Sequence, residues 1–177
     1  MQPSKPGDLR RYIRDLPDYP VKGVIFRDLT PLFKDEKAFR LAVDRLAGFY
    51  KREKVDMVAA VEARGFIVGA PLALKLGVGF VPLRKPGKLP WKKRKVTYRL
   101  EYADESIEIH EDALKKGQRV LLVDDLLATG GTAAAAAKLI EELGAKVMGM
   151  AFIVELKYLG GRNKLKGYDV RSLLVYE

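Results

Sequence analysis

The stretch that decides the fold is residues 120–137, VLLVDDLLATGGTAAAAA. Four apolar residues, typical of a buried strand, lead directly into Asp124 and Asp125, and an alanine-rich segment typical of a helix follows a short loop. In an open parallel sheet the carboxyl ends of the strands form the ligand crevice, so the two carboxylates are expected at its edge. The stretch therefore predicts an α/β fold with a ligand site where this strand ends.

The loop between this strand and this helix, residues 128–132, has the sequence ATGGT. Gly130 and Gly131 can adopt backbone angles that let amide N–H groups converge, and the helix N-terminus adds a field that favours an anion. Thr129 and Thr132 add hydroxyl donors. A glycine-rich turn beside an acidic surface pair is the alternative. The carboxylate pair, the loop and the helix together favour a site in which the loop binds a phosphate monoester and the carboxylates bind neutral hydroxyls.

The same loop excludes two common nucleotide-binding classes. It lacks the GKS or GKT end of a Walker A motif and the GxGxxG pattern of a dinucleotide fold, so neither a nucleoside triphosphatase nor a dehydrogenase is supported. The chain contains no cysteine, which also excludes disulfides, thiolate metal sites and thiol nucleophiles.

Strand, helix and strand patterns occur twice, and each such unit is expected to place its two strands parallel in one sheet. A helix with one apolar stripe precedes both units, and one more strand ends the chain. The sequence thus predicts a central, mostly parallel sheet flanked by helices. The expected segments are a helix at 35–53, a first unit at 56–61, 66–76 and 79–84, a second unit at 120–123, 132–143 and 147–156, and a strand at 172–176.

The length of 177 residues suits one compact domain. We expect an N-terminal arm and hood over residues 1–34 and a core over residues 35–177, which includes a flexible loop at 85–110. This loop begins KPGKLPWKKRK, where prolines, a glycine and dense cations disfavour any regular element. The alternation that follows predicts a hairpin with strands at 98–102 and 106–110, turning at 103–105, with Glu108 and His110 exposed to solvent.

The composition indicates which kinds of partner and which cellular compartment are expected. The net charge of +10 favours polyanionic or phosphorylated partners. The first twenty residues contain no apolar signal region and no segment is long enough to span a bilayer, so we expect a soluble cytoplasmic protein without membrane contact. One asparagine and two glutamines beside abundant lysine and glutamate are typical of a thermophilic source.

Residues 120–137 resemble the phosphoribosyl pyrophosphate signature of the type I phosphoribosyltransferases. The resemblance implies that family's fold and a role for each residue of the signature. Asp124 and Asp125 would hold the ribose 2- and 3-hydroxyls. The 5-phosphate would be held by Ala128, Thr129, Gly130, Gly131 and Thr132.

Residues 17–31, PDYPVKGVIFRDLTP, resemble the hood of the adenine phosphoribosyltransferase branch of this family. The resemblance implies that Phe26 stacks on adenine and that the backbone of Val24 and Ile25 reads the edge of the base, with Arg27 beside them. Purine recognition needs a flat apolar contact and a few placed hydrogen bonds, which a rigid loop can provide. A proline-rich arm that only packs on the core is the alternative.

Two further segments extend the resemblance over nearly the whole chain. Residues 61–66, VEARGF, resemble the family's pyrophosphate loop, in which Arg64 would bind the leaving group. Residues 82–91 and 100–102, PLRKPGKLPW and LEY, resemble the loop that closes over the site. Lys85 and Tyr102 are then expected to contact pyrophosphate. Glu101 is expected to handle the N9 proton of adenine or to steady the base.

The chain departs from the family pattern at two positions. Ala63 stands where the family has serine, and Ala103 stands where it has glycine. The first change removes one hydroxyl contact to pyrophosphate or its metal, and the second stiffens the closing hairpin. Neither alters a charged residue of the expected site.

The resemblance implies transfer of a phosphoribosyl group from phosphoribosyl pyrophosphate to adenine, giving AMP and pyrophosphate. Arg64, Lys85 and Glu101 would be the catalytic residues, Mg²⁺ would be held mainly by the substrate, and the protein would be a homodimer. A phosphoribosyltransferase for a 6-oxopurine is the nearest alternative. A phosphoribosyl pyrophosphate-sensing regulator of nucleic acid is another, but no reading module precedes the core, so no nucleic-acid partner is expected.

Overall fold

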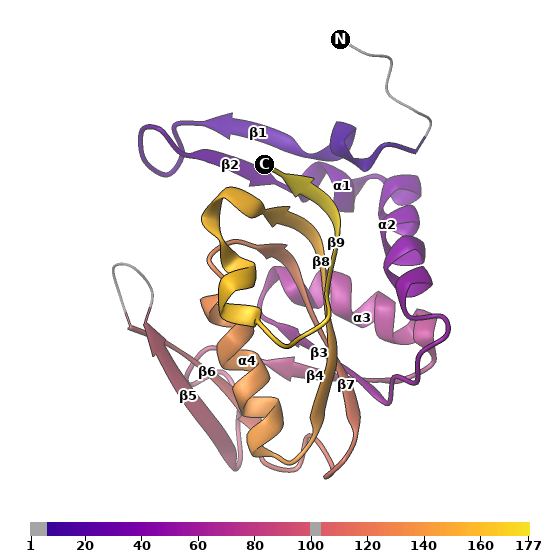
Figure 1. Ribbon diagram of the computed structural model, residues 1–177, viewed down its shortest axis with the longest axis vertical. Helices are drawn as coiled ribbons and strands as arrows, with labels where there is room; N and C mark the ends of the chain where they lie inside the picture. The colour runs from indigo at the N-terminus through magenta and orange to yellow at the C-terminus, as the bar shows by residue number, and fades with distance from the viewer. Residues whose placement is uncertain (1–6, 100–103) are drawn as a thin grey trace.

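The computed structural model describes residues 7–99 and 104–177. A parallel sheet of five strands lies at the centre, with strand order β4-β3-β7-β8-β9 (Figure 1). The predicted parallel pairing is confirmed, since each strand of this sheet runs parallel to its neighbours. The strands are β3 (Met57–Val61), β4 (Gly79–Leu83), β7 (Arg119–Leu127), β8 (Lys146–Leu156) and β9 (Val170–Tyr176).

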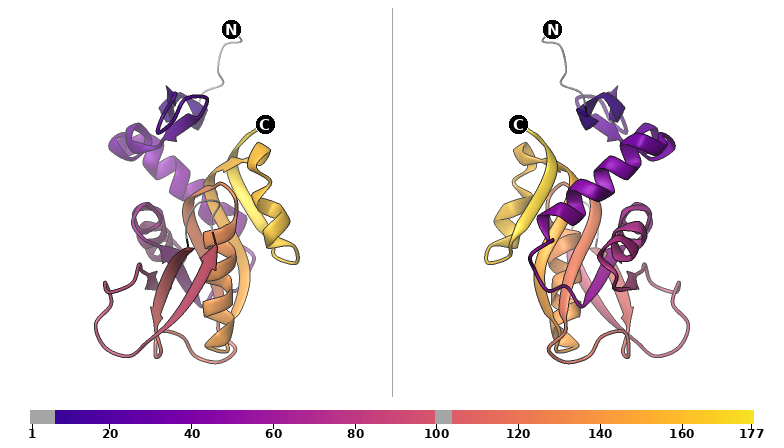
Figure 2. Two further views of the ribbon diagram at one scale, coloured as in Figure 1. Left: turned by 90° about the vertical axis from the view of Figure 1, so that its left-hand side faces the viewer. Right: turned by 90° about the vertical axis from the view of Figure 1, so that its right-hand side faces the viewer.

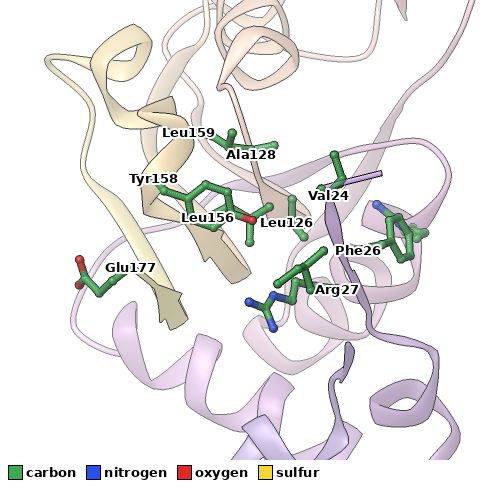
Figure 3. Close-up of a pocket in the computed structure, with 12 residues that line it drawn as sticks. Val24, Phe26, Arg27, Leu126, Ala128, Leu156, Tyr158, Leu159 and Glu177 are labelled. Atoms are coloured by element: carbon green, nitrogen blue, oxygen red, sulfur yellow. The ribbon is translucent and has the colours of Figure 1, made fainter. Parts of the chain in front are cut away.

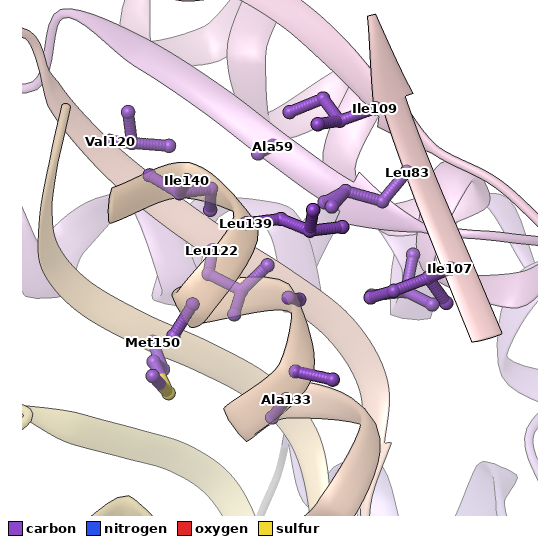
Figure 4. Close-up of a cluster of buried hydrophobic side chains, with 14 of the residues drawn as sticks. Ala59, Leu83, Ile107, Ile109, Val120, Leu122, Ala133, Leu139, Ile140 and Met150 are labelled. Atoms are coloured by element: carbon purple, nitrogen blue, oxygen red, sulfur yellow. The ribbon is translucent and has the colours of Figure 1, made fainter. Parts of the chain in front are cut away.

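Alternation along the strands divides the core between the two faces of the sheet. Ala59 and Leu122 point to the face covered by α4 (Gly131–Glu142), where they pack with its alanines and with Leu139 (Figure 4). Val58 and Leu121 point to the other face, which α2 (Glu36–Phe49) and α3 (Arg64–Leu76) cover. Figure 2 shows α4 and α3 on opposite sides of the sheet.

The predicted first helix exists but is shorter than residues 35–53. It begins after Asp35, whose carboxylate accepts a hydrogen bond from the Ala38 N–H at 2.9 Å, a normal N-cap. It ends at Phe49, because Tyr50 leaves the helical conformation, buries its ring and donates its hydroxyl to the Met150 carbonyl at 3.2 Å. Residues 51–54, KREK, are all charged, so they cannot continue the apolar stripe of this helix.

The N-terminal arm forms a small layer of its own at the upper end of Figure 1. A short 3-10 helix, η1 (Leu9–Tyr12), leads into an antiparallel hairpin of β1 (Arg14–Pro17) and β2 (Ile25–Asp28), and α1 (Thr30–Lys34) joins it to α2. Leu9, Leu29 and Leu32 are fully buried in the cluster on the α2 and α3 face. The arm is therefore anchored to the core, while the hairpin loop projects from it.

The second hairpin is longer than the sequence predicted. β5 (Lys93–Arg99) pairs with β6 (Asp104–His110), so the cationic residues from Lys93 onwards are strand, and Asp104 and Glu105 belong to β6 rather than to a turn. Cross-strand pairing with β6 overrides the low strand propensity of the lysines. Residues 100–103, which connect the two strands, lie outside the described residues.

The prediction that Glu108 is solvated is wrong. Ile107 and Ile109 pack into the core, and residues 84–93 cover the opposite face of β6, so Glu108 is only 5% exposed. Its carboxylate accepts a hydrogen bond from the Gly87 N–H at 3.2 Å and pairs with Lys93 Nζ at 3.3 Å. His110 is partly exposed, and its Nε2 lies 2.7 Å from the Pro90 carbonyl oxygen.

The segment between β8 and β9 was not anticipated. It contains two short 3-10 helices, η2 (Lys157–Leu159) and η3 (Gly161–Leu165), separated by Gly160 in a left-handed conformation. Within residues 7–99 and 104–177, the helices are all too short or too polar to cross a membrane.

Candidate active site

The two predicted carboxylates lie near the end of β7, at the carboxyl edge of the sheet. The strand continues past them to Leu127, because the ladder with β8 continues through the Asp124–Phe152 and Leu126–Val154 pairs. Asp125 is 3% exposed. Removal from water and the neighbouring charge of Asp125 raise the pKa of Asp124 well above its usual range. Burial also raises the pKa of Asp125, against the opposing charge of Arg64.

Arg64 is the first residue of α3 and reaches across to the end of β7. Its Nε lies 2.7 Å from Asp125 Oδ2. This approach requires glycine at the next position, since a Cβ on Gly65 would lie 2.8 Å from Asp124 Oδ1 and 3.3 Å from the Val123 carbonyl oxygen. Asp125 Oδ2 is buried and, apart from this ion pair, has no hydrogen-bond partner among the described residues.

The glycine-containing loop closes the end of the crevice beyond Asp124. Gly130 has φ +77° and caps α4, which begins at Gly131 as the sequence predicted within one residue. Residues 128–132 line a cavity of about 80 Å³ together with Asp124 and Phe152. The predicted loop residues, Ala128, Thr129, Gly130, Gly131 and Thr132, therefore share one small cavity at the N-terminus of a twelve-residue helix.

A second, polar cavity of about 220 Å³ lies on the β3 side of β7. Arg64 and Lys85, which the sequence assigned to one site, both line it with Asp124 and Asp125. The Lys85 N–H donates to Glu62 Oε1 at 2.7 Å, and Arg84 Nε pairs with Glu62 Oε2 at 2.8 Å, so one carboxylate fixes the loop that carries Lys85. Ala63, the first departure from the family pattern, lines the same cavity.

Two residues of the hairpin that sequence reasoning did not select also line the polar cavity. The Tyr98 hydroxyl donates to Glu105 Oε2 at 3.0 Å and lies 3.2 Å from Thr132 Oγ1. The hairpin thus contacts the loop after β7 directly. The alternation of β5 offered a signal, because Tyr98 shares the face of Val96, which is buried.

A third cavity, about 720 Å³, lies on the β8 side of β7, under the first hairpin. Val24, Ile25, Phe26 and Arg27 line it, as the sequence predicted for one site. Figure 3 shows Phe26 on one side of this cavity and Tyr158 on the other, with Leu126 between them. The lining residues that the sequence did not reveal are Gly23, Leu126, Leu156, Tyr158, Leu159 and Glu177.

The side chains of Phe26 and Arg27 have different surroundings. Phe26 packs edge-on against Tyr19, with ring centroids 5.3 Å apart, and Arg64 lies 5.8 Å from its ring centroid. Arg27 forms an ion pair with Asp15, and its guanidinium lies 4.0 Å from the centroid of the Tyr176 ring. Arg27 therefore ties the hood to the end of β9, whereas Phe26 leaves a ring available to the cavity.

The remaining predicted residues, Glu101 and Tyr102, lie outside the described residues, as does Ala103. Within the part of the chain that is described, no three acidic or histidine side chains form a group that could hold a metal ion. The three cavities together follow the carboxyl edge of the sheet. Asp124 lines the two smaller ones, and Arg64 lines the two larger ones.

Comparison with known proteins identifies the family. Residues 33–174 match the phosphoribosyl transferase domain. The adenine phosphoribosyltransferase of Thermotoga neapolitana is 56% identical over 96% of this chain and 99% of that protein. The crystal structure of the enzyme from Thermoanaerobacter pseudethanolicus is 54% identical with a TM-score of 0.92, covering 95% of this chain and 98% of that one.

A Saccharomyces cerevisiae adenine phosphoribosyltransferase, solved with an imino-altritol bisphosphate and adenine, is 41% identical with a TM-score of 0.89 over 94% of this chain and 96% of that one. Identity at this level extends over nearly the full length of both chains, and the folds agree over the same share of each chain. This chain belongs to the adenine phosphoribosyltransferase family.

Proposed function

We propose that this protein transfers the 5-phosphoribosyl group of phosphoribosyl pyrophosphate to adenine, giving AMP and pyrophosphate. The observation that carries the proposal is the set of three cavities along one sheet edge: a small one at residues 128–132, a polar one with Arg64 and Lys85, and a large apolar one under Phe26. They suit, in that order, a phosphate monoester, a pyrophosphate and a flat base.

The ribose would lie over the end of β7, between these cavities. Its hydroxyls are donors, and Asp125 Oδ2 is a buried acceptor whose one close partner among the described residues is the Arg64 guanidinium. Two carboxylates whose pKa values are raised by burial would gain partners when a diol binds. The amide groups at the start of α4 would hold the 5-phosphate.

Departure of pyrophosphate from C1 leaves negative charge on the leaving oxygens. Arg64 and Lys85 supply two cations to the polar cavity, and preorganised charge of this kind stabilises the transition state without reorganising at the moment of reaction. The Arg64 fork also suits paired phosphate oxygens. Glu101 is proposed, from the family resemblance, to receive the N9 proton of adenine or to steady the base, and Tyr102 to contact pyrophosphate.

The residues present fit a magnesium ion that the substrate carries. Carboxylate oxygens are ligands that Mg²⁺ prefers, and Asp124 and Asp125 both line the polar cavity. Two carboxylates cannot form a complete cage, so pyrophosphate oxygens would supply most ligands. When bound, the ion would neutralise pyrophosphate charge.

We further propose that the protein acts as a cytoplasmic homodimer, on the strength of the family resemblance. Light scattering coupled to size-exclusion chromatography tests the dimer, and a mass of one chain, 19.8 kDa, would contradict it.

The function is tested by offering radiolabelled adenine, hypoxanthine and guanine separately, with phosphoribosyl pyrophosphate and magnesium, to the wild type and to Asp125→Asn. We expect turnover of adenine alone, and a loss of about tenfold to a hundredfold in kcat/KM for the variant, the scale of one charged hydrogen bond. Asp44→Asn, on the exposed face of α2, is the matched control. Turnover of a 6-oxopurine would overturn adenine specificity, and no turnover of any base would favour a sensing role.

A further inference from the structure

An ion pair behind the crevice, between a buried glutamate and a half-exposed arginine, is not used by the proposed reaction. Glu155, on β8, is 3% exposed and accepts hydrogen bonds from Arg162 Nε at 2.6 Å, Arg162 Nη2 at 2.7 Å and Ser172 Oγ at 2.8 Å. Arg162 Nη1 donates to the Val170 carbonyl at 2.9 Å. Fork-like pairing of this kind fixes direction as well as distance, so Arg162 is held between β8 and β9.

Arg162 is the second residue of η3, and the first residue of η3 touches the loop after β7. A Cβ on Gly161 would lie 2.2 Å from the Ala128 carbonyl oxygen and 3.1 Å from the Gly130 amide nitrogen. In the reverse direction, a Cβ on Gly130 would lie 2.3 Å from the Gly161 carbonyl oxygen. The two backbones are therefore in direct contact, and no side chain can be placed between them.

The contact lies on the outer side of the small cavity that residues 128–132 line. Binding groups need support within fractions of an ångström, and a loop held only by its own ends does not provide it. The loop after β7 is supported instead by η3, whose position is set by the Glu155–Arg162 pair one residue away.

We propose that Glu155 and Arg162 are positioning residues for the 5-phosphate: they hold Gly161 against the loop at 128–132 and so set the affinity for the phosphate monoester. This inference rests on the proposed function for its ligand. It assigns a role to η3, which would act on the substrate through the loop at residues 128–132.

The test measures binding by calorimetry, with ribose 5-phosphate and with pyrophosphate as separate probes. In Arg162→Lys, which keeps the charge but loses the fork, we expect the dissociation constant of ribose 5-phosphate to rise about tenfold while that of pyrophosphate stays within about twofold. The pyrophosphate cavity, with Arg64 and Lys85, has no lining residue between 156 and 165, so general loosening of the fold would move both constants together.

Arg171→Lys is the matched control. Arg171 lies on β9 and pairs with two carboxylates, Glu53 at 2.6 Å and Asp169 at 2.7 Å, but its guanidinium faces the end of α2 rather than η3. We expect no change in either dissociation constant. Equal effects of the two arginine variants on ribose 5-phosphate would overturn the proposal.

Gly161→Ala provides a second route if Arg162→Lys does not fold. It leaves the ion pair intact and inserts one methyl group at the backbone contact, whereas Gly48→Ala inserts a methyl where no atom lies within 4 Å. We expect weaker binding of ribose 5-phosphate only in Gly161→Ala. Unchanged binding there would contradict the proposal. A wild type that binds ribose 5-phosphate but does not convert adenine would refute the proposed function and leave this inference standing.

Discussion

Asp124 and Asp125 lose hydration and repel each other near the end of β7, so this pair destabilises the ligand-free protein. Burial and the charge of Asp125 raise the pKa of Asp124 above its ordinary value of 3.8. For a carboxyl group raised in this way, the native state binds more protons than the unfolded state between the two pKa values. Stability attributable to Asp124 is therefore fully present below pH 3.8 and is lost as the pH rises through the folded-state pKa.

The first prediction concerns Asp124→Asn, which keeps the shape and removes the ionisation. We expect the free energy of unfolding of the ligand-free variant to exceed that of the wild type at neutral pH, and the difference to disappear below pH 3.8. Urea titrations at a series of pH values measure it. A variant that is less stable than the wild type at neutral pH would show that Asp124 is satisfied before substrate binds.

That gain in stability is expected to be accompanied by a loss of activity. Groups poised for a substrate are commonly destabilising in its absence, because the partners they need are supplied by the ligand. Binding of ribose 5-phosphate should weaken in Asp124→Asn. The two measurements together separate a structural aspartate from one that is held ready for a diol.

At the scale of elements, α2 offers a simple test of helix propensity. Gly48 lies in its last turn, exposed, with no atom within 4 Å of a Cβ and without a positive φ. Replacing glycine by alanine in a helix reduces the entropy lost on folding, so Gly48→Ala should stabilise the protein by about 0.5–1 kcal/mol. Thermal unfolding in parallel with Gly77→Ala gives the contrast, since Gly77 ends α3 with φ +71° and alanine is strained there. Destabilisation by Gly48→Ala would mean that the end of α2 is not helical in solution.

An element could be predicted from the sequence when its own residues determine it. It could not be predicted when its extent depends on a neighbouring strand or loop. The apolar run before Asp124 and the alanines after Gly131 identify a strand and a helix with no knowledge of neighbours, and both are confirmed. The extension of β7 to Leu127 could not be seen, because its cause is the ladder with β8. The burial of Glu108 has the same origin: residues 84–93 cover a face that alternation alone leaves open to water.

The candidate site divides in a similar way. Phe26, Arg64 and Lys85 belong to segments whose sequence resembles a family, and each lines a cavity at the carboxyl edge of the sheet. Tyr158 and Leu159 belong to η2, a short 3-10 helix directly after β8. No periodic pattern predicts this segment, so only the folded chain reveals that the residues after β8 form one wall of the apolar cavity.

At the scale of the whole molecule, the charge of +10 bears on substrate capture. An excess of positive charge attracts a polyanion over distances that salt shortens, from about 10 Å at 0.1 M ionic strength to about 3 Å at 1 M. We expect the KM for phosphoribosyl pyrophosphate to rise with added potassium chloride, while the KM for adenine, which is neutral, stays nearly constant. Steady-state kinetics over a salt series tests this, and a parallel rise in both constants would indicate a general effect on the enzyme.

Thermal stability is the second property of the whole chain. The scarcity of asparagine and glutamine beside abundant lysine and glutamate predicts an unfolding midpoint above the range of about 45–65 °C in which mesophilic domains cluster. Scanning calorimetry of the ligand-free protein measures it. A midpoint inside that range would contradict the prediction.

The strand order places β7 in the middle of the sheet, with the polar cavity on its β3 side and the apolar cavity on its β8 side. A sugar ring seated on β7 would have its nucleophile approaching from one flank and its leaving group departing from the other. In-line displacement inverts the configuration at the anomeric carbon, so the product nucleotide would have the opposite anomeric configuration to the donor. The strand order of the sheet would then determine the configuration of the glycosidic bond in the product.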